Sequence, residues 1–428
     1  MARPKILYAG GGERAQYLLH DFNDTTIRFV LNYPGLIDPD ILRTAAKAVV
    51  ESVNVLHSTF FSDPVSAYWY VNENVEENNY FHYISASGDL AATAESLAVL
   101  PVYPEDKVQM HVYLVQSETA SSMVVRISHM VCDGGDGKYL LNKLIEAYNR
   151  IAENGSVEGL EIKDGNRAPE KVYEHLTSEE RKALRSAGMA TSVPTAYPYP
   201  NTDSGMNRMT KAVIPAETMA AARKKAKTAG ASANDLLITA FYHAYATTEG
   251  VDAHATMSVS SMMDLRRHCT DGHSAALANM SGSMSTTLEN GVGDSFGETL
   301  AMVAEQTATA KENPLAGLEG MPIMHGLVRA MPVGLMIKLM SKVYGNPSIG
   351  MTNMGNLKCA DYALDGLVPV GGAFGGPLKK KPGMQISVMS FDGECVLAVL
   401  GNHTNEDVAT IRCTLDALVK EISAYAAD

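Results

Sequence analysis

The amino-acid sequence predicts an α/β (α+β) protein built from two mixed domains, and three observations support this fold class. Short apolar runs with the pattern of β-strands are interspersed with segments in which apolar residues recur at helical spacing. The chain has 428 residues, which is long for one hydrophobic core and normal for two domains of about 200 residues each. A turn-rich stretch separates two segments of similar character. We therefore expect an N-terminal half at 1–190, a linker at 191–207 and a C-terminal half at 208–428.

The predicted elements of the first half alternate between strand and helix. Strands are expected at 26–33, 58–61, 109–115 and 123–128. A helix is expected over 38–56, because Asp38-Pro39 is a typical helix start and apolar residues follow it at helical spacing. Apolar residues recur in the same way from Tyr139 to Tyr148, which predicts a second helix after the last of these strands.

The second half shows the same mixture of patterns, although we detect no sequence repeat between the halves. It is expected to contain helices at 215–230, 233–247 and 405–424 and strands at 257–266, 384–390 and 396–400. The turn residues between the last two strands predict a hairpin. The methionine-rich segment 324–340 is interpreted as a core helix interrupted at Pro332, and the alternative is the lining of an apolar channel.

Composition narrows the possible partners and the compartment. The 35 Lys plus Arg residues against 48 Asp plus Glu give a net charge of −13, which argues against nucleic acid and anionic membranes as general partners. No apolar run approaches the roughly 18 to 20 residues of a membrane span, and no signal-peptide core follows Met1. The five cysteines are scattered, odd in number and without metal-ligand spacing. We expect a cytoplasmic protein without a metal site.

The residues from His129 to Gly134 form a His-x-x-x-Asp-Gly motif between a predicted strand and a predicted helix. The glycines from Gly134 to Gly137 suit the sharp turn that this junction needs. A lone histidine in such a place is more often a partly buried side chain that caps the strand. An imidazole with a near-neutral pKa at a strand end also has the properties of a general base.

Two further landmarks follow in a fixed order. A predicted strand ends in Asp264-Leu265-Arg266, and Ala278-Asn279-Met280 comes shortly after it. A predicted loop at 348–355 contains Thr352-Asn353 before a glycine. With these landmarks the chain resembles the acyltransferase superfamily that includes chloramphenicol acetyltransferase, alcohol acetyltransferases, plant BAHD transferases and peptide-synthetase condensation domains. The resemblance implies two chloramphenicol acetyltransferase-like sandwich domains in a V, with the active site in the channel between them.

The resemblance also implies roles for individual residues of the motif. His129 would be the general base of an acyl transfer that needs no acyl-enzyme. Asp133 would be structural and would form a buried bidentate pair with Arg266. The backbone N–H of Gly134 would face the developing oxyanion, together with the loop at Thr352.

Three residues are expected in the substrate and donor channel, namely Thr352, Asn353 and Asn279. The cosubstrate would be acyl-coenzyme A or an acyl-phosphopantetheine, with no bound cofactor. The partners would be a small-molecule donor and a hydroxyl or amine acceptor, with an acyl carrier protein as an alternative source of the donor. We expect a monomer.

The position before the motif histidine separates branches of the superfamily. Condensation domains usually carry a second histidine there, and this chain has Ser128. The plant-type Asp-Phe-Gly-Trp-Gly motif is absent from the sequence. Both observations favour a free-standing O- or N-acyltransferase. Two alternatives stay open, a condensation-type amide or ester synthase with a carrier-bound donor, and a noncatalytic homologue that binds a carrier protein or ligand.

Three other features have simpler interpretations. Gly10-Gly11-Gly12 lacks the spacing and the βαβ context of a dinucleotide-binding turn, so we assign it to N-terminal architecture. Cys132 lies inside the motif but has no orienting third group, which argues against a Cys-His nucleophile. Lys379-Lys380-Lys381 is interpreted as a solvated turn, and contact with the phosphates of coenzyme A or phosphopantetheine is the alternative.

Overall fold

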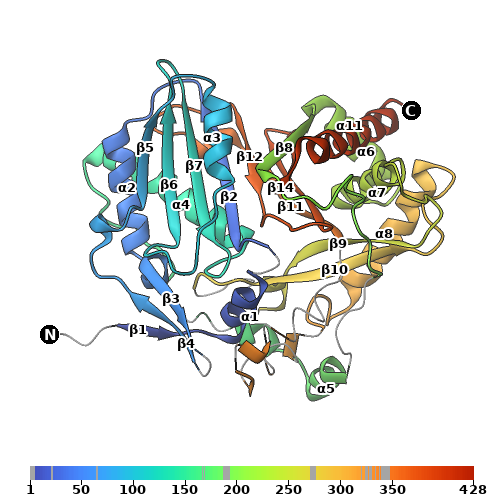
Figure 1. The fold of residues 1–428 in the computed structure, drawn as a ribbon, viewed down its shortest axis with the longest axis horizontal. Coiled ribbons are helices and arrows are strands. Elements are labelled where there is room, and N and C mark those ends of the chain that lie inside the picture. The colour runs from blue at the N-terminus through green and yellow to red at the C-terminus, as the bar shows by residue number, and fades with distance from the viewer. Residues whose placement is uncertain are drawn as a thin grey trace.

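The computed structural model describes residues 5–20, 23–63, 66–165, 167, 169–186, 193–269, 276–319, 321–322, 326, 330–332, 334–336, 338 and 348–428. These residues form two lobes that lie side by side, each a mixture of helices and strands (Figure 1), and the predicted α/β fold class is confirmed. The first lobe contains β1 (Ile6–Tyr8), α1 (Gly11–Leu19), β2 (Thr26–Tyr33), α2 (Pro39–Glu51), β3 (Ser58–Ser62), β4 (Ala67–Val71), β5 (Phe81–Ser85), α3 (Leu90–Ala98), β6 (Met110–Gln116), β7 (Ser121–Ser128) and α4 (Gly134–Asn154). The helix α5 (Ser178–Ser186) follows α4 in the chain, and its Leu184 packs with Leu265 and Met280 of the second half. The remaining elements are β8 (Met206–Ile214), α6 (Ala216–Thr228), α7 (Ala233–Ala246), β9 (Met257–Asp264), β10 (Ser281–Leu288), α8 (Phe296–Glu312), β11 (Ile349–Leu357), β12 (Gly371–Gly375), β13 (Met384–Phe391), β14 (Glu394–His403) and α11 (Asn405–Ala427).

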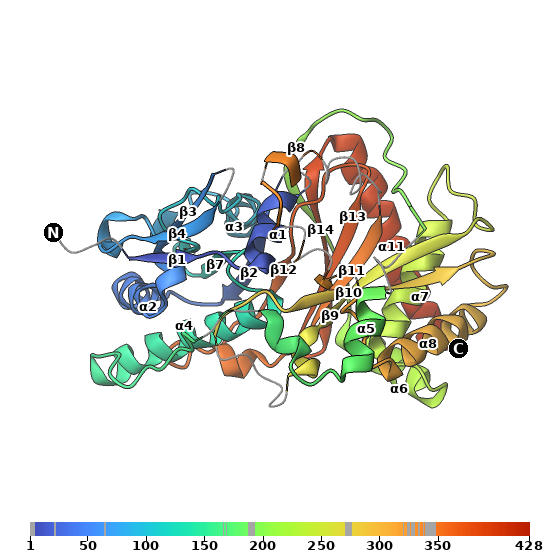
Figure 2. The same ribbon diagram turned by 90° about the horizontal axis from the view of Figure 1, so that it is seen from below.

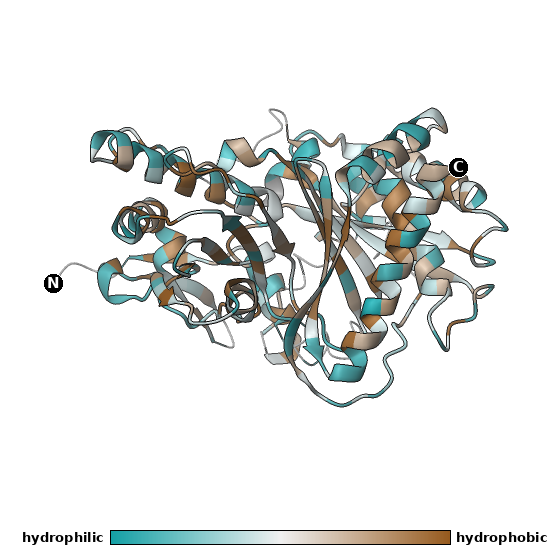
Figure 3. Ribbon diagram, turned by 90° about the horizontal axis from the view of Figure 1, so that it is seen from above, coloured by the Kyte–Doolittle hydropathy of each residue, from teal (hydrophilic) through white to brown (hydrophobic). Residues whose placement is uncertain are grey.

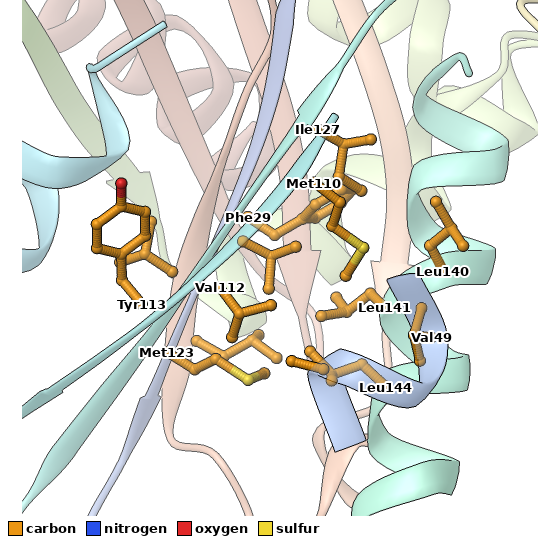
Figure 4. Close-up of a cluster of buried hydrophobic side chains, with 14 of the residues drawn as sticks. Phe29, Val49, Met110, Val112, Tyr113, Met123, Ile127, Leu140, Leu141 and Leu144 are labelled. Carbon is orange, nitrogen blue, oxygen red and sulfur yellow. The ribbon is translucent and has the colours of Figure 1, made fainter. Parts of the chain in front are cut away.

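The sheet of the first lobe has the strand order β12-β2-β7-β6-β5. Helices α2 and α4 cover one face of it, and α3 packs on the other face (Figure 1). Leu140, Leu141 and Leu144 of α4 point at the strands together with Val49 of α2, whereas Tyr113 lies on the opposite face (Figure 4). This packing follows from the apolar stripe of α4 and fixes the direction in which β7 delivers its last residue, Ser128.

One strand of this sheet comes from the second half of the sequence. β12 pairs antiparallel with β2, so that Gly372 lies opposite Leu31, and the ring of Phe374 packs 5.3 Å from that of Phe29. The strands expected at 109–115 and 123–128 are present as β6 and β7, and β12 and β5 form the two edges of the sheet. A five-residue segment with three glycines has no strand signal of its own. The division at 191–207 stays a prediction, with this one strand crossing it.

The sheet of the second lobe has the order β10-β9-β11-β13-β14-β8, and α6, α7, α8 and α11 pack together on one side of it (Figure 2). Apolar residues are concentrated on the strands and on the sides of the helices that face them (Figure 3). The predicted hairpin is confirmed by the antiparallel pair β13–β14, whose turn residues Asp392 and Gly393 have φ of 47° and 97°. A third, small sheet has the order β1-β4-β3.

The segment at 348–355, expected to be a loop, is strand β11. It runs parallel to both neighbours, β9 and β13, in the middle of the sheet. The glycine, asparagine and threonine residues of β11 have little propensity for strand structure. A position between two strands satisfies the backbone hydrogen bonds on both sides and so outweighs this low propensity. The pairing with β13 is irregular between Asn353 and Asn356, so that the predicted Thr352-Asn353 pair lies just before a bulge.

Two other boundaries differ from the sequence prediction. The helix expected over 38–56 ends at Glu51 and is followed by a short 3-10 helix at Asn54–His57. Most of the methionine-rich segment 324–340 and the first two residues of the expected linker lie outside the described residues. In the part of the chain that the structure describes, no helix is long and apolar enough to cross a membrane.

Candidate active site

His129 is the first residue after β7, and backbone hydrogen bonds hold it at the lobe junction. Its N–H donates to the carbonyl of Thr25 at 2.7 Å, and Val131 N–H donates to Ser128 at 3.0 Å, which turns the chain toward α4. Ser128 and Met130 are buried on either side, whereas His129 itself is partly exposed. The imidazole is therefore the accessible group of a rigid strand end.

Asn279 holds the imidazole from the second half of the chain. Its Nδ2 lies 2.9 Å from His129 Nδ1 and donates to the His129 carbonyl oxygen at 3.0 Å. Its Oδ1 accepts from Ser281 N–H at 3.1 Å, which fixes the orientation of the amide. The structure brings Asn279 to His129, and its expected place in a substrate channel stays a prediction. Nε2 is left as the ring nitrogen that Asn279 does not contact.

Burial lowers the pKa of His129 below the ordinary value of about 6.5. The charge of Asp133 and hydrogen bonds with the backbone of His129 and Cys132 act in the opposite direction, and the charge of Lys379 lowers the pKa further. Desolvation is the largest of these effects. The imidazole is consequently neutral at pH 7.

Arg266 joins the motif to the second lobe through two carboxylates. Its Nη1 lies 2.8 Å from Asp133 Oδ2, and its Nη2 lies 2.8 Å from Asp136 Oδ2. Asp264 lies 3.1 Å from Nη1 on the exposed side of the guanidinium. The sequence expectation of a bidentate Asp133–Arg266 pair is therefore wrong in its geometry, because the guanidinium divides its two nitrogens between Asp133 and Asp136.

The two carboxylates also bind the backbone of the segment that carries Asn279. Asp133 Oδ2 accepts from Met280 N–H at 2.7 Å, and Asp136 Oδ2 accepts from Ala278 N–H at 2.9 Å. Asp133 Oδ1 accepts from Asp136 N–H at 3.0 Å and so caps α4. The amides on both sides of Asn279 are thus clamped to the motif.

Sequence reasoning did not identify Asp136 as a site residue. Its side chain is 2% exposed, and Lys163 Nζ lies 2.5 Å from its Oδ1. Burial raises the pKa of Asp136, and the charges of Arg266 and Lys163 oppose that shift. The sequence does contain a signal for this role. Asp136 is an acidic residue three positions after Asp133, so both carboxylates lie at the start of the same helix.

The first turn of α4 lies against β11. A Cβ added to Gly134 would meet Met354 Sδ at 2.6 Å, so any larger residue would require the methionine side chain to move. Thr352, two residues earlier on β11, is partly exposed. Asn353 is exposed, and its Oδ1 accepts from Gly355 N–H at 2.9 Å, which stabilises the turn at the bulge. The expected roles of Thr352 and Asn353 toward a donor stay predictions.

The N-terminal helix closes one side of this region. Glu13 of α1 accepts from Trp69 Nε1 at 2.9 Å and pairs with Arg167 at 2.8 Å. A cavity of about 10 Å³ lies between this helix and the segment of Asn279, and its lining includes Gly10 and Met130. That volume is enough for about one water molecule. The Gly10–Gly12 turn therefore forms part of the protein wall beside the site.

Two candidates from the sequence can now be placed. Cys132 is fully buried, and burial raises the pKa of its thiol well above the ordinary value, so it is not a thiolate nucleophile. The three lysines do not form one basic patch. Lys381 lies 2.6 Å from the buried Asp407 and stacks on Tyr199, Lys380 is exposed, and Lys379 is partly buried near His129.

Comparison with solved structures shows which proteins share this fold. The chain superposes on polyketide synthase associated protein 5 from Mycobacterium tuberculosis with a TM-score of 0.71 and 15% identity, over 97% of each chain. Trichothecene 15-O-acetyltransferase from Fusarium sporotrichioides gives a TM-score of 0.71 at 14% identity, over 99% of this chain and 95% of that one. The first condensation domain of the calcium-dependent antibiotic synthetase gives 0.71 at 16% identity, over 99% and 97%.

No protein-family model matches the sequence, and no curated protein matches it. At these identities the structural neighbours establish the fold, which is the two-lobed fold of condensation domains and chloramphenicol acetyltransferase-like enzymes. The fold that the sequence resemblance implied is confirmed.

The shared guanidinium predicts an unequal cost for removing its partners. Arg266→Met should lower the free energy of unfolding by about 3–5 kcal/mol, because it leaves the buried carboxylate of Asp133 without a cation and Asp136 with Lys163 alone. Asp133→Asn should cost less, about 1–3 kcal/mol, because Arg266 keeps Asp136 and asparagine still caps α4. Chemical denaturation of the full chain measures both values.

The double variant should lose less than the sum of the single losses, because neither orphan charge remains. Lys420→Met, which removes an exposed charge on α11, is the control and should change stability by less than about 0.5 kcal/mol. An Asp133→Asn variant as unstable as Arg266→Met, or strict additivity, would contradict the shared pairing.

Proposed function

We propose that the protein is an acyltransferase that moves an acyl group from a thioester to a hydroxyl or amine, with His129 as the general base. The observation that carries this proposal is a neutral, partly exposed imidazole at a strand end, oriented by Asn279 at the junction of two lobes. The printed names of the structural neighbours include an acetyltransferase and condensation domains, which supports the same class of reaction.

The proton path follows from the hydrogen bonds of the ring. We assign the proton of the neutral imidazole to Nδ1, which donates to the carbonyl oxygen of His129 itself. The same oxygen accepts from Asn279 Nδ2, so the amide holds the ring through this shared acceptor and does not donate to Nδ1. Nε2 then has a free lone pair. It takes the proton of the acceptor hydroxyl or amine as the acceptor oxygen or nitrogen attacks the thioester carbonyl carbon. When the tetrahedral intermediate collapses, the C–S bond breaks and the imidazolium returns the proton to the thiolate.

Stabilisation of the oxyanion is the second requirement. Gly134 is the first residue of α4, so its N–H has no partner inside the helix, and the helix dipole favours negative charge there. Thr352 of the neighbouring strand is the candidate hydroxyl donor. The structure brings Gly134 and β11 together through Met354, which keeps both donors on rigid elements.

The donor is proposed to be acyl-coenzyme A. Ser128 is fully buried, with its Oγ 3.4 Å from Met130 N, so no second side chain joins His129 from that position. A carrier-bound donor is the second candidate, because one structural neighbour is named as a polyketide synthase associated protein. The two candidates differ in the donor they require and not in the role of His129.

Removal of the base should abolish transfer without unfolding the protein. His129→Ala should lower turnover by about 10²- to 10⁴-fold, because proton removal from the acceptor is lost while little packing changes. The measurement is thiol release from a panel of acyl-coenzyme A donors with mixed alcohol and amine acceptors, followed by mass spectrometry of the products. A parallel panel of acyl-phosphopantetheinyl carrier protein distinguishes the second candidate.

Circular dichroism and the melting temperature of His129→Ala should match the wild type. His129→Gln keeps much of the shape and should be as inactive as His129→Ala. Near-wild-type turnover in either variant would refute the mechanism. If the wild type releases no thiol in either panel, the noncatalytic alternative holds.

The pH dependence reports the environment of the base. Because burial lowers the pKa of His129, kcat/KM should stay high on acidification and fall only below about pH 6.5, as the imidazole takes up a proton. Asn279→Asp places a carboxylate beside Nδ1, favours the imidazolium and should move this inflection to higher pH.

Asn279→Ala is the matched control for that shift. It removes the same hydrogen bonds without adding charge, so it should lower kcat without raising the inflection. An unchanged profile in Asn279→Asp would show that Asn279 does not contact the base in solution.

A further inference from the structure

Lys379 is a partly buried cation near His129 that the proposed transfer does not use. Its backbone bridges Asn23 on one side and Gly401 on the other. Thr25, two residues after Asn23, accepts the hydrogen bond from His129 N–H. Alternate residues of an extended segment lie about 7 Å apart, so Lys379 and His129 attach to neighbouring positions of one backbone segment. Their charges interact strongly enough for Lys379 to lower the pKa of His129.

The ammonium of Lys379 has no counter-ion of its own. Within the described residues, no carboxylate lies within 4.0 Å of Lys379 Nζ and no group hydrogen-bonds to it. Asp24 is the carboxylate that acts on it electrostatically, but Asp24 already pairs with Arg28 and accepts from Leu378 N–H at 2.6 Å. By contrast, Lys381 has Asp407 at 2.6 Å. Lys379 is partly exposed, and its ammonium is therefore available to a ligand.

A second unused donor lies on the adjoining strand. Gln385 of β13 is 9% exposed, and its amide makes no hydrogen bond within the part of the chain that is described. A Cβ on Gly376 would lie 3.6 Å from Gln385 Nε2, and a Cβ on Gly383 would lie 3.9 Å from the Cβ of Lys379. Gln385 therefore adjoins the same short segment, 376–383, that carries Lys379.

We propose that Lys379 and Gln385 bind a carboxylate of the substrate, carried either by the acyl group or by the acceptor. This inference rests on the proposed acyl transfer at His129. An ammonium and an amide N–H₂ group are suitable donors to the two oxygens of one carboxylate. The phosphates of coenzyme A are excluded as the occupant, because the whole pantetheine arm separates them from the thioester that must reach His129.

The test compares probes that differ only in a terminal carboxylate. The full chain is titrated calorimetrically with succinyl-coenzyme A against butyryl-coenzyme A, and with 6-hydroxyhexanoate against 1,6-hexanediol, each probe alone so that no transfer occurs. At least one acid should bind about ten- to a hundredfold more tightly than its neutral partner. A preference in the first pair places the carboxylate on the acyl group, and one in the second pair places it on the acceptor.

Lys379→Met should abolish the preference, and Gln385→Leu should reduce it. Lys420→Met, an exposed lysine changed in the same way, should retain it, and melting temperatures show that each variant is folded. Equal affinities in both pairs, or a preference that survives Lys379→Met, would overturn the inference. Binding is measured without turnover, so thiol release without an acid preference refutes only this inference. An acid preference without thiol release refutes only the proposed transfer.

Discussion

The site depends on one guanidinium shared between two carboxylates from the other half of the chain. Arg266 follows β9 in the second half, and Asp133 and Asp136 stand at the start of α4 in the first. The same carboxylates accept from the backbone amides of Ala278 and Met280. The intervening Asn279 is therefore delivered to His129 by an ion cluster that touches neither substrate nor base. Buried pairs of this kind add little net stability, but they fix geometry when every lone pair has a donor.

Burial has a larger effect on the protonation of His129 than any one of the charges around it. Asp133 favours the imidazolium, but its charge is already matched by Arg266. Lys379 on the other side favours the neutral ring. If the ammonium of Lys379 takes up a substrate carboxylate, the nearest positive charge is neutralised and the imidazole becomes a stronger base at that moment. Substrate binding and base strength would then be coupled through one side chain.

The sequence predicts the local part of this arrangement well and the distant part poorly. Strand, turn and helix from 121 to 154 follow from periodicity and glycine placement, because each depends on neighbouring residues. Asp136, the amide of Asn279 and the ammonium of Lys379 enter the site through contacts more than a hundred residues apart in the chain. Strand β11 was missed for the same reason, since its two neighbouring strands and not its own residues make it extended.

The segment from Gly371 to Lys379 explains why the two lobes and the site are inseparable. It joins the sheet of the first lobe as β12 and then passes along β13 and β14 of the second. A Cβ on Gly372 would lie 2.0 Å from the Val30 carbonyl oxygen, and one on Gly375 would lie 2.8 Å from Leu400. Only glycine permits this close passage between the lobes. Because the same segment ends at Lys379, any change in the angle between the lobes would move that ammonium relative to His129.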